Sequence, residues 1–395
     1  MLTGLTPQPA DGILRIMALF GDDPRPGKVD LGIGVYRDAA GTTPVMRAVK
    51  TAERLLWERE TTKSYTGLAG DPAFCTALRD LVLGPAVPAE RVAVAATPGG
   101  TGAVHQALEL VQRNAPEARV HVPVPTWPNH LSILRHIGLA TTPYRYFEAA
   151  TGAVDIGGMM ADLGRVRAGD VVLLHGCCHN PTGANLARAD WRALAGLLAE
   201  RGALALVDIA YQGFGDGLDA DAAGLRHLAA TLPEVLVAAS CSKNFGIYRE
   251  RTGAVMAIAS DAATAALAQG TLAHLNRQNY SFPPDHGARL VTMILADPAL
   301  RADWQDELEG MRTAMLGNRE RLAGALRAET GSDRFGFLAG HRGMFSLIGA
   351  TEAQVARMRE EHAVYLVGDG RLNVAGLNEA NIPTVARAIA ACCPG

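Results

Sequence analysis

The sequence of 395 residues lacks the features of several large classes of protein. Its formal net charge is only −3, so it offers no basic surface to nucleic acid or to an anionic membrane. No apolar run reaches the ~18 residues that a membrane span requires. The start, MLTGLTPQPADGILRIMALFGDD, has neither the basic beginning nor the apolar centre of a signal peptide. We therefore expect a cytoplasmic protein whose partners are neither nucleic acids nor membranes.

Cysteine is scarce and forms no regular framework. The six cysteines are Cys75, Cys177, Cys178, Cys241, Cys392 and Cys393. This pattern is typical of free thiols in a reducing compartment. The stretch HGCCH (175–179) has the residue types of a zinc site, but they are contiguous in an extended segment. No second CxxC or HxxxH supplies the remaining ligands, so we expect no metal site.

What the sequence does contain is an alternation of apolar runs and helical patterns. The hydrophobic fraction of 48% and the charged fraction of 19% indicate a folded globular protein. Five runs indicate buried strands that leave a sheet at their C-terminal ends: 118–130, 169–183, 202–215, 234–246 and 252–260. Helical patterns over 188–202 and 312–331 end at Gly202 and Gly331. This alternation predicts an α/β fold with a largely parallel sheet.

The length of the chain predicts a large and a small domain, because one ordinary core rarely grows so large. We expect residues 1–42 to form an N-terminal arm and part of the small domain. Residues 43–310 then form the large domain, and residues 311–395 the rest of a small α+β domain. The break near residue 310 falls at the predicted long helix.

Polar residues follow the apolar runs at the points where the predicted strands end. They are Trp127, Asn180, Asp208, Tyr211 and Lys243. In open α/β sheets, ligands bind outside the carboxyl ends of the strands. We therefore expect these side chains to form a ligand site.

Lys243 lies just after an apolar run, in SCSKNFGIYRERTG (240–253). A lysine at the end of a buried strand is costly unless it has a partner or a function. It is either a surface residue of a loop or an amine that forms a Schiff base with a carbonyl cofactor. The small or polar neighbours Ser240, Ser242 and Asn244 leave room for a planar ligand.

Each of the other polar residues also has two interpretations. Asp208, in LALVDIAY, is a helix N-cap or metal ligand, or a carboxylate that faces the protonated ring nitrogen of pyridoxal phosphate. Tyr211 and Trp127 either fill the core or lie against that ring. Asn180 either forms a turn or donates to the phenolate oxygen of the cofactor. His130 is either structural or orients Asp208 from behind.

A glycine-rich turn opens a predicted helix in TPGGTGAVHQALELV (97–111). It is neither a Walker motif nor GxGxxG. The start of such a helix presents free N–H groups and a partial positive charge to an anion. With Ser240 and the guanidinium of Arg251, it forms a candidate phosphate site.

Seven stretches together resemble the class I aminotransferases of fold type I, in the aspartate and aromatic-amino-acid subgroup. They are DLGIGVYRD, PGGTGA, PTWPNH, HGCCHNPTG, DIAYQGFGDG, SKNFGIYRERTG and GRLNVAGL. The resemblance runs from about residue 3 to the C-terminus and is greatest to bacterial aromatic-amino-acid aminotransferases. It implies a large seven-stranded domain, a small domain from both chain ends, and a homodimer with shared active sites.

The resemblance also implies a cofactor and its ligands. Lys243 carries pyridoxal phosphate as a Schiff base and moves the proton in the 1,3-shift. Asp208, backed by His130, binds the pyridinium, Tyr211 and Asn180 bind the phenolic oxygen, and Trp127 stacks on the ring. The residues implied for the phosphate are Gly100, Thr101, Ser240, Ser242, Arg251 and, from the neighbouring subunit, Tyr65.

For the substrate, the resemblance implies that Arg371 binds the α-carboxylate and that Arg277 of the neighbouring subunit binds a distal carboxylate. Gly34, Trp127, Asn180 and Ser281 complete the substrate site. Phe282 departs from the polar residue usual in strict aspartate enzymes and adds apolar surface near the site. We expect ping-pong transamination of Phe, Tyr, Trp, Asp and Glu with 2-oxoglutarate as acceptor; a strict aspartate aminotransferase is the alternative.

Three other functions fit the sequence less well. A nicotinamide oxidoreductase needs GxGxxG after a first strand and an acid ~20 residues further on, and the sequence has neither. A lyase or decarboxylase with the same cofactor has no need for both Arg371 and Arg277. A non-catalytic regulator has no need for Lys243, Asp208 and Arg371 together.

Overall fold

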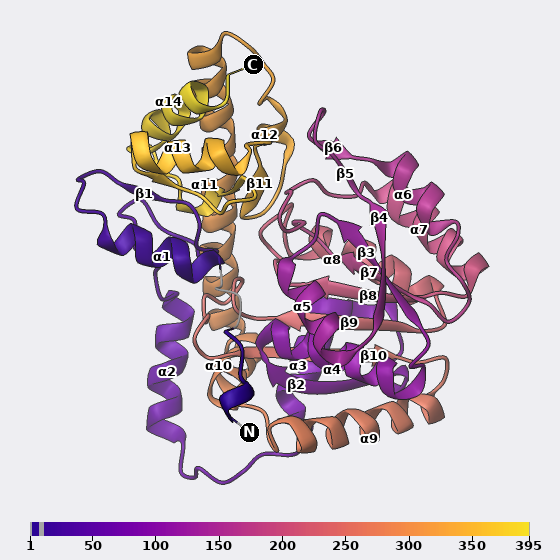
Figure 1. Ribbon diagram of the computed structural model, residues 1–395. Coiled ribbons are helices and arrows are strands. Elements are labelled where there is room, and N and C mark those ends of the chain that lie inside the picture. The colour runs from indigo at the N-terminus through magenta and orange to yellow at the C-terminus, as the bar shows by residue number, and fades with distance from the viewer. Residues whose placement is uncertain (1, 8–11, 395) are drawn as a thin grey trace.

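A seven-stranded sheet forms the centre of the computed structural model, which describes residues 2–7 and 12–394 (Figure 1). In sheet order the strands are β2 (Val92–Pro98), β10 (Thr252–Ile258), β9 (Val235–Ser240), β8 (Leu204–Ile209), β7 (Val171–His175), β3 (Arg119–Val124) and β4 (Ala140–Arg145). The strands from β9 to β4 are parallel, whereas β10 is antiparallel to both β9 and β2. The predicted α/β class with a mostly parallel sheet is confirmed. The prediction that all five runs end at the same edge of the sheet is wrong for β10. Its N-terminal end lies at the edge where its neighbours β2 and β9 have their C-terminal ends.

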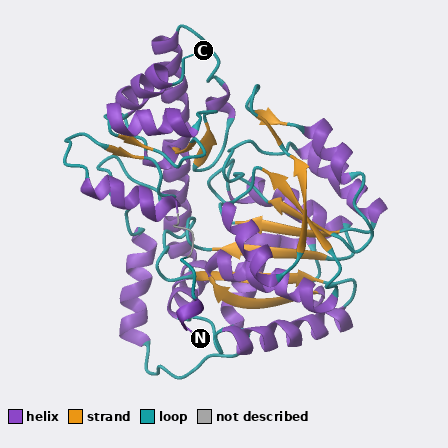
Figure 2. Ribbon diagram, viewed as in Figure 1, coloured by secondary structure: helices purple, strands orange, loops and turns teal. Residues whose placement is uncertain are grey.

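Helices cover both faces of this sheet, as Figure 2 shows. Alternate residues of β2 and β8 enter opposite cores: Val94 and Val207 lie in one, Ala95 and Leu206 in the other. Burial of both faces explains why these strands read as continuous apolar runs. The helices around the sheet are α3 (Pro72–Leu83), α4 (Gly99–Asn114), α5 (Pro128–Ile137), α6 (Ile156–Leu163), α7 (Arg188–Arg201), α8 (Leu218–Thr231), α9 (Ala262–Asn279) and α10 (His286–Ala296).

A second, smaller core brings the two ends of the chain together. Val29 and Leu31 pack there with residues from 322 to 393. In a small parallel pair, β1 (Val29–Asp30) lies beside β12 (Val364–Tyr365). The other elements of this part are α1 (Gly12–Asp22), α12 (Phe337–Gly340), β11 (Phe345–Leu347), α13 (Glu352–His362), β13 (Arg371–Asn373) and α14 (Ile382–Cys392). The exact domain limits at residues 42 and 310 stay a prediction.

One long helix, α11 (Pro298–Thr330), contributes to both cores (Figure 1). Asp297 caps its start by accepting N–H bonds from Ala299 and Leu300, and Pro298 occupies the first turn. Gly331 ends it in the left-handed conformation, as predicted. The predicted start at residue 312 is wrong, because the periodicity is weak where α11 crosses from one core to the other.

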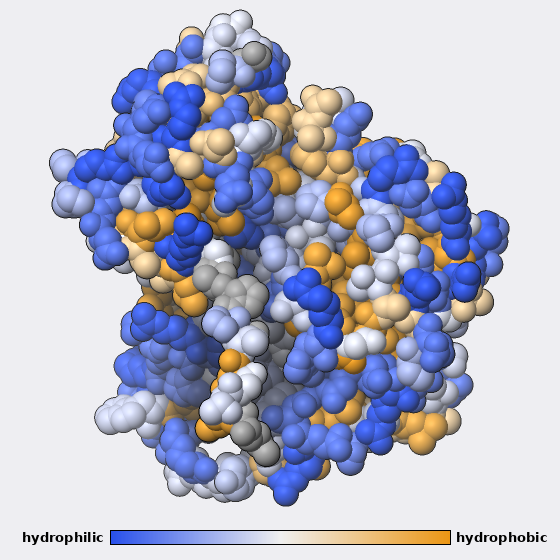
Figure 3. Space-filling model, in the orientation of Figure 1, coloured by the Kyte–Doolittle hydropathy of each residue, from blue (hydrophilic) through white to orange (hydrophobic). Residues whose placement is uncertain are grey.

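The remaining elements lie outside the central sheet, and two of them, a helix and a 3-10 turn, contribute buried residues to the two cores. They are α2 (Arg47–Arg59), the hairpin of β5 (Phe147–Glu148) and β6 (Ala153–Val154), and the 3-10 turns Leu2–Gly4, Gly84–Ala86, Ala89–Arg91 and Val374–Gly376. Hydrophilic residues cover much of the face drawn in Figure 3, with hydrophobic residues in separate patches between them. Among the residues that the structure describes, no helix is both long and apolar enough to cross a membrane.

Candidate active site

A cavity lies at the sheet edge where β7, β8 and β9 end. The backbone register aligns His175 with Asp208 and Asp208 with Ala238, so these strand ends lie next to one another. The lining residues are Gly100, Thr101, Trp127, His175, Cys177, Asn180, Asp208, Ala210, Tyr211, Ser240, Ser242, Lys243 and Arg251. The structure thus brings together the residues that the sequence selected at strand ends and in the glycine-rich turn.

One end of the cavity is built for an anion. It is formed by the first turn of α4, which starts at Gly99 with φ +70°. A Cβ atom on Gly99 would lie 2.6 Å from Nη2 of Arg251, and one on Gly100 would lie 2.9 Å from Cβ of Ser240. Glycine therefore lets both side chains approach the free N–H groups of the helix start. Helix dipole, guanidinium and hydroxyl together suit a phosphate group.

A buried carboxylate occupies another wall of the cavity. Oδ2 of Asp208 lies 3.0 Å from Nε2 of His130, which is fully buried. Nδ1 of His130 lies 2.9 Å from the hydroxyl of Thr126, and that hydroxyl lies 3.1 Å from Nε2 of His175. Burial lowers the pKa of His175 to about 3, so this imidazole is neutral. This chain of contacts holds Asp208 in place, and the carboxylate suits a positively charged ring nitrogen in the cavity.

Lys243 lies in the turn directly after β9. Its Nζ is 5.1 Å from the centre of the Tyr211 ring. Burial lowers the pKa of Lys243 to about 8; Asp208 opposes this shift and Arg251 adds to it. The neutral amine is therefore accessible near neutral pH, which is the form that attacks a carbonyl and accepts a proton.

Arg371 reaches the cavity through Asn180. Nη1 of Arg371 donates to Oδ1 of Asn180 at 3.1 Å, and the amide of Asn180 lies 3.5 Å from the Tyr211 hydroxyl. The guanidinium lies 4.6 Å from the centre of the Phe345 ring. Nε of Arg371 is buried and has no hydrogen-bond partner among the residues that the structure describes, so the side chain retains capacity to bind a carboxylate. Gly34 adjoins this group, because a Cβ atom there would lie 2.9 Å from Cζ of Phe345.

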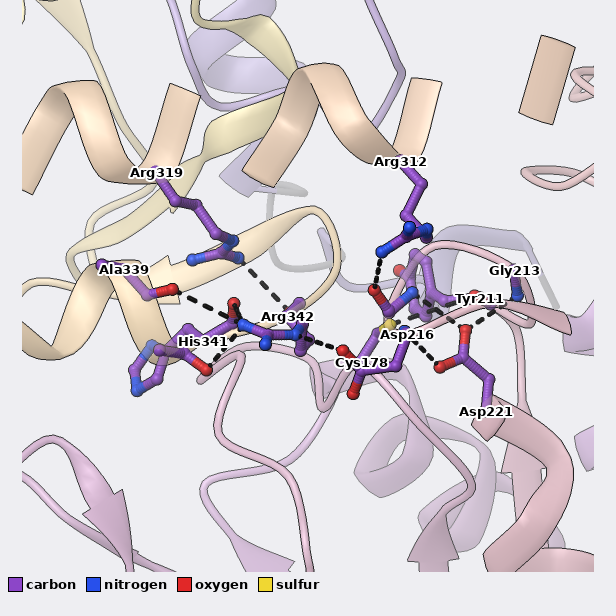
Figure 4. Close-up of polar contacts among 12 residues, drawn as sticks. Cys178, Tyr211, Gly213, Asp216, Asp221, Arg312, Arg319, Ala339, His341 and Arg342 are labelled. Carbon is purple, nitrogen blue, oxygen red and sulfur yellow. Dashed lines mark hydrogen bonds and ion pairs between the residues drawn. The ribbon is translucent and has the colours of Figure 1, made fainter. Parts of the chain in front are cut away.

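The loop that carries Tyr211 is braced from behind (Figure 4). The carboxylate of Asp221 accepts N–H bonds of 2.8–2.9 Å from residues 213, 215 and 216. Asp216 pairs at 2.7 Å with Arg342 of the small core, whose backbone N–H donates to Gly183. These bonds connect the Tyr211 loop to the segment that carries Phe345.

The same region contains a group of residue types that bind metals. Ligand atoms of Cys177, Cys178 and Asp221 lie within 4.8 Å of one another. The hydrogen bond between the thiols and their burial raise the pKa of Cys177, and burial raises that of Cys178. Since the carboxylate of Asp221 already accepts three N–H bonds, the group is better suited to structure than to a metal.

Three of the predicted site residues, Tyr65, Arg277 and Ser281, lie elsewhere on the chain together with Phe282, and we call these four residues the projecting group. Tyr65 and Arg277 are exposed, whereas Ser281 and Phe282 are half-buried. Tyr65 is 85% exposed and stacks on Phe282 with ring centres 4.8 Å apart. Nη1 of Arg277 donates to the Ser281 hydroxyl at 2.6 Å, and its guanidinium lies 5.7 Å from the Phe282 ring centre. The residues lining the cavity of this chain do not include the projecting group.

Several residues of the cavity region were not predicted from the sequence. His175, Cys177 and Ala210 line the cavity, and Thr126 connects two of its histidines. The strand-end rule that selected Asp208 could also have selected His175, its partner in register. Phe345 had no signal, because it meets Arg371 through the pairing of β11 with β13 and Gly34 through contact with the opposite end of the chain.

Comparisons with known proteins agree with this geometry. The family described as aminotransferase class I and II matches residues 26–389, and the chain belongs to this family. It is 59% identical over 389 residues to an aromatic-amino-acid aminotransferase of Paracoccus denitrificans, covering 98% of this chain and 99% of the relative. It is 44% identical over 394 residues to an aspartate aminotransferase of Escherichia coli strain K12, covering 99% and 100%.

A solved structure adds the cofactor. It is an aromatic-amino-acid aminotransferase of Burkholderia pseudomallei, described as covalently bound to pyridoxal phosphate. The TM-score is 0.96 at 40% identity, over 99% of each chain. The family is dependent on pyridoxal phosphate. The residues of this cavity fit that group: an anion site, an acid for a ring nitrogen and an amine of lowered pKa line one space.

Proposed function

We propose that the chain transaminates aromatic and dicarboxylic amino acids, with 2-oxoglutarate as the amino acceptor and pyridoxal phosphate on Lys243. The observation that carries the proposal is the meeting of Lys243, Asp208 and the α4 anion site in one cavity. The relatives support both substrate classes, since one is named for aromatic amino acids and another for aspartate.

Each part of the cavity has a role in this chemistry. When bound, pyridoxal phosphate supplies an aldehyde for the amino group and a protonated ring that withdraws electrons. Asp208, held by His130, stabilises positive charge at the ring nitrogen, and Asn180 and Tyr211 donate to the ring's oxygen. Trp127 presents its indole to the ring. The phosphate is held by Gly100, Thr101, Ser240, Ser242 and Arg251.

The substrate is oriented by the chain itself. Arg371 binds the α-carboxylate through its buried Nε, which has no other hydrogen-bond partner among the described residues, and Gly34 and Phe345 close the space beside it. The neutral amine of Lys243 takes the α-proton and returns it, because its pKa of about 8 permits both protonation states near neutrality. Movement of the small domain over the cavity closes the site and excludes water from these steps.

We further propose a cytoplasmic homodimer in which the projecting group serves the neighbouring subunit. Tyr65 then contacts the partner's phosphate site, and Arg277, supported by Ser281, binds the distal carboxylate of a dicarboxylic substrate. The exposure of Tyr65 supports this arrangement. Trp57 on α2 is also 82% exposed, which adds apolar surface suited to an interface.

The replacement Lys243→Ala tests the proposal. Turnover of both aspartate and phenylalanine should fall on the order of 10²–10⁴-fold, since the acid–base group is lost. Borohydride reduction followed by peptide mass spectrometry should place the cofactor on residue 243 in the wild type and nowhere in the variant. Lys50→Ala, at an exposed lysine paired with Glu53, is the matched control and should behave as wild type. Covalent cofactor retained by Lys243→Ala would overturn the proposal.

A further inference from the structure

Asn276 is a fully buried amide next to Arg277 in the sequence. Its Nδ2 donates to the carbonyl oxygens of Leu68 at 2.9 Å and Ala96 at 3.0 Å. Its Oδ1 accepts short hydrogen bonds from Nε2 of Gln106 and from the hydroxyl of Tyr280. Both donors and both acceptor positions of the side-chain amide are thus used.

These four bonds fix several segments relative to one another. Leu68 follows Tyr65 by three residues, and Ala96 lies in β2 just before the anion site. Gln106 lies on α4. The amide of Asn276 therefore ties the end of α9 to the segment that carries Tyr65, to the sheet and to the helix of the anion site.

The projecting side chains are held much less firmly. Arg277 donates to Ser281, only four residues along the chain, and its guanidinium faces Phe282. Tyr65 stacks on the same ring. Where Arg277 and Tyr65 lie relative to the sheet is thus set by the backbone beneath them, and that backbone is anchored by Asn276.

We propose that Asn276 and Gln106 form a positioning pair. By holding the backbone that carries Arg277, the pair places the guanidinium at the position that favours dicarboxylic over aromatic substrates. The inference rests on the proposed role of Arg277 toward a distal carboxylate. A charge-assisted hydrogen bond depends steeply on distance and angle, and a misplacement of about 1 Å can cost about 100-fold in rate. An aromatic side chain is bound by non-directional apolar contact and is much less sensitive to such a shift.

Two variants of different severity test the pair. Asn276→Leu removes all four hydrogen bonds of the amide. Gln106→Leu removes one of the two donors to the amide oxygen, together with the bonds of Gln106 to Tyr280 and Asn279, and leaves Tyr280 bonded to the amide oxygen. The amino-donor half-reaction, measured without acceptor, gives kcat/KM for aspartate and for phenylalanine. We expect Asn276→Leu to lower the aspartate value about tenfold, mainly through KM, and to leave the phenylalanine value within about twofold. Gln106→Leu should shift the ratio the same way by about threefold.

Binding of unreactive analogues gives a second readout. Calorimetry on the holoenzyme should show weaker binding of succinate in both variants and unchanged binding of 3-phenylpropionate. The two probes differ in the distal carboxylate, so a general loss of folding cannot produce this difference.

Gln269 offers a matched control on the same helix. It ties α9 to β2 by two bonds, donating to the carbonyl of Val94 at 2.9 Å and accepting from its N–H at 2.8 Å. It lies two turns before Arg277. Gln269→Leu should lower the melting temperature without changing the ratio of aspartate to phenylalanine.

Three results would overturn the inference. The first is a folded Asn276→Leu variant whose ratio of kcat/KM for aspartate to that for phenylalanine equals the wild-type ratio. The second, if Asn276→Leu does not fold, is the wild-type ratio in Gln106→Leu. The third is a Gln269→Leu control whose ratio shifts as much as that of the Asn276 variant. A wild-type protein that reacts with phenylalanine but neither reacts with aspartate nor binds succinate overturns the proposed role of Arg277 as well. A wild type active on both donors, with variants that keep its ratio, overturns the positioning role alone.

Discussion

The cavity and the projecting group contain residues predicted for one active site, yet they differ in every physical respect. In the cavity, Asp208 is 8% exposed and is held by a buried histidine. In the projecting group, Tyr65 is 85% exposed and contacts a phenylalanine on the surface. A buried polar group must find its partners within the chain, because burial without them is costly. An exposed one can be completed by another chain.

The comparison teaches that one chain holds the covalent chemistry but not the whole of substrate recognition. Lys243 has its environment, and hence its lowered pKa, in the isolated fold. The guanidinium of Arg277 contacts Ser281 and Phe282, and within the described part of the chain it forms no ion pair with an acid. Removing apolar surface from water is favourable by about 25 cal/mol per Å². An exposed aromatic side chain such as that of Tyr65 lacks this stabilisation in the single chain and gains it when a second chain covers it.

The largest effect that would sharpen this comparison is expected for Arg277→Leu. Loss of a charge-assisted bond to the distal carboxylate should lower kcat/KM for aspartate on the order of 100-fold, and that for phenylalanine by no more than about threefold. The donor half-reaction without acceptor is the measurement. Equal losses for the two amino acids would separate Arg277 from side-chain recognition.

Mixing two inactive variants tests whether the two regions work across subunits. In a co-expressed mixture of Lys243→Ala and Arg277→Leu, each hybrid dimer contains one cavity with Lys243 and the partner's intact Arg277. Random pairing of a symmetric dimer should restore about a quarter of the wild-type aspartate activity.

The control for this mixture is Lys243→Ala combined with Asp208→Ala. Both changes lie in the cavity, so every site in the mixture carries a defect and activity should stay lost. No recovery in the first mixture would place Arg277 and Lys243 in the same subunit and break the comparison.

The smallest expected effect is the pH dependence of the reactivity of Lys243, which concerns the cavity and not the projecting group. Burial makes the folded pKa of Lys243 lower than usual, so its amine is neutral above about 8 and protonated below. In cofactor-free protein, acetylation of Lys243 should therefore slow about tenfold per pH unit below 8 and level off above it. Peptide mass spectrometry after competitive acetylation gives the rate.

Asp208 opposes the lowering of this pKa, so Asp208→Asn should move the midpoint to lower pH. Arg277→Leu, in the projecting group, should leave the midpoint in place. A midpoint near 10 in the wild type would show that the amine is solvated and that the cavity does not tune it.

Much of the cavity could be predicted from the sequence, because its residues follow apolar runs. Asp208, Ser240 and Lys243 lie at or just beyond the ends of β8 and β9, and parallel strands place such ends at one edge. Gly99 and Gly100, which lie beside Arg251 and Ser240, could be recognised from the sequence only as part of a turn. That turn begins α4, as expected.

Other features had no local signal. The antiparallel direction of β10 cannot be read from an apolar run, which looks the same in both directions. The early start of α11 depends on Asp297 and Pro298 acting as a cap for a helix that spans two cores. Phe345 adjoins Gly34 from the opposite end of the chain, and Asn276 bonds to Leu68 across 208 residues of sequence.

The residue pattern alone specified the α/β class, the strand-end residues of the cavity and the helix start of the candidate anion site. It did so because the period of apolar residues and the residues that follow each run depend on local geometry. Only the tertiary structure decided that Arg371 meets Asn180 and that Tyr65 and Arg277 share one exposed group outside the cavity. Those arrangements depend on packing between distant segments, which no local pattern encodes.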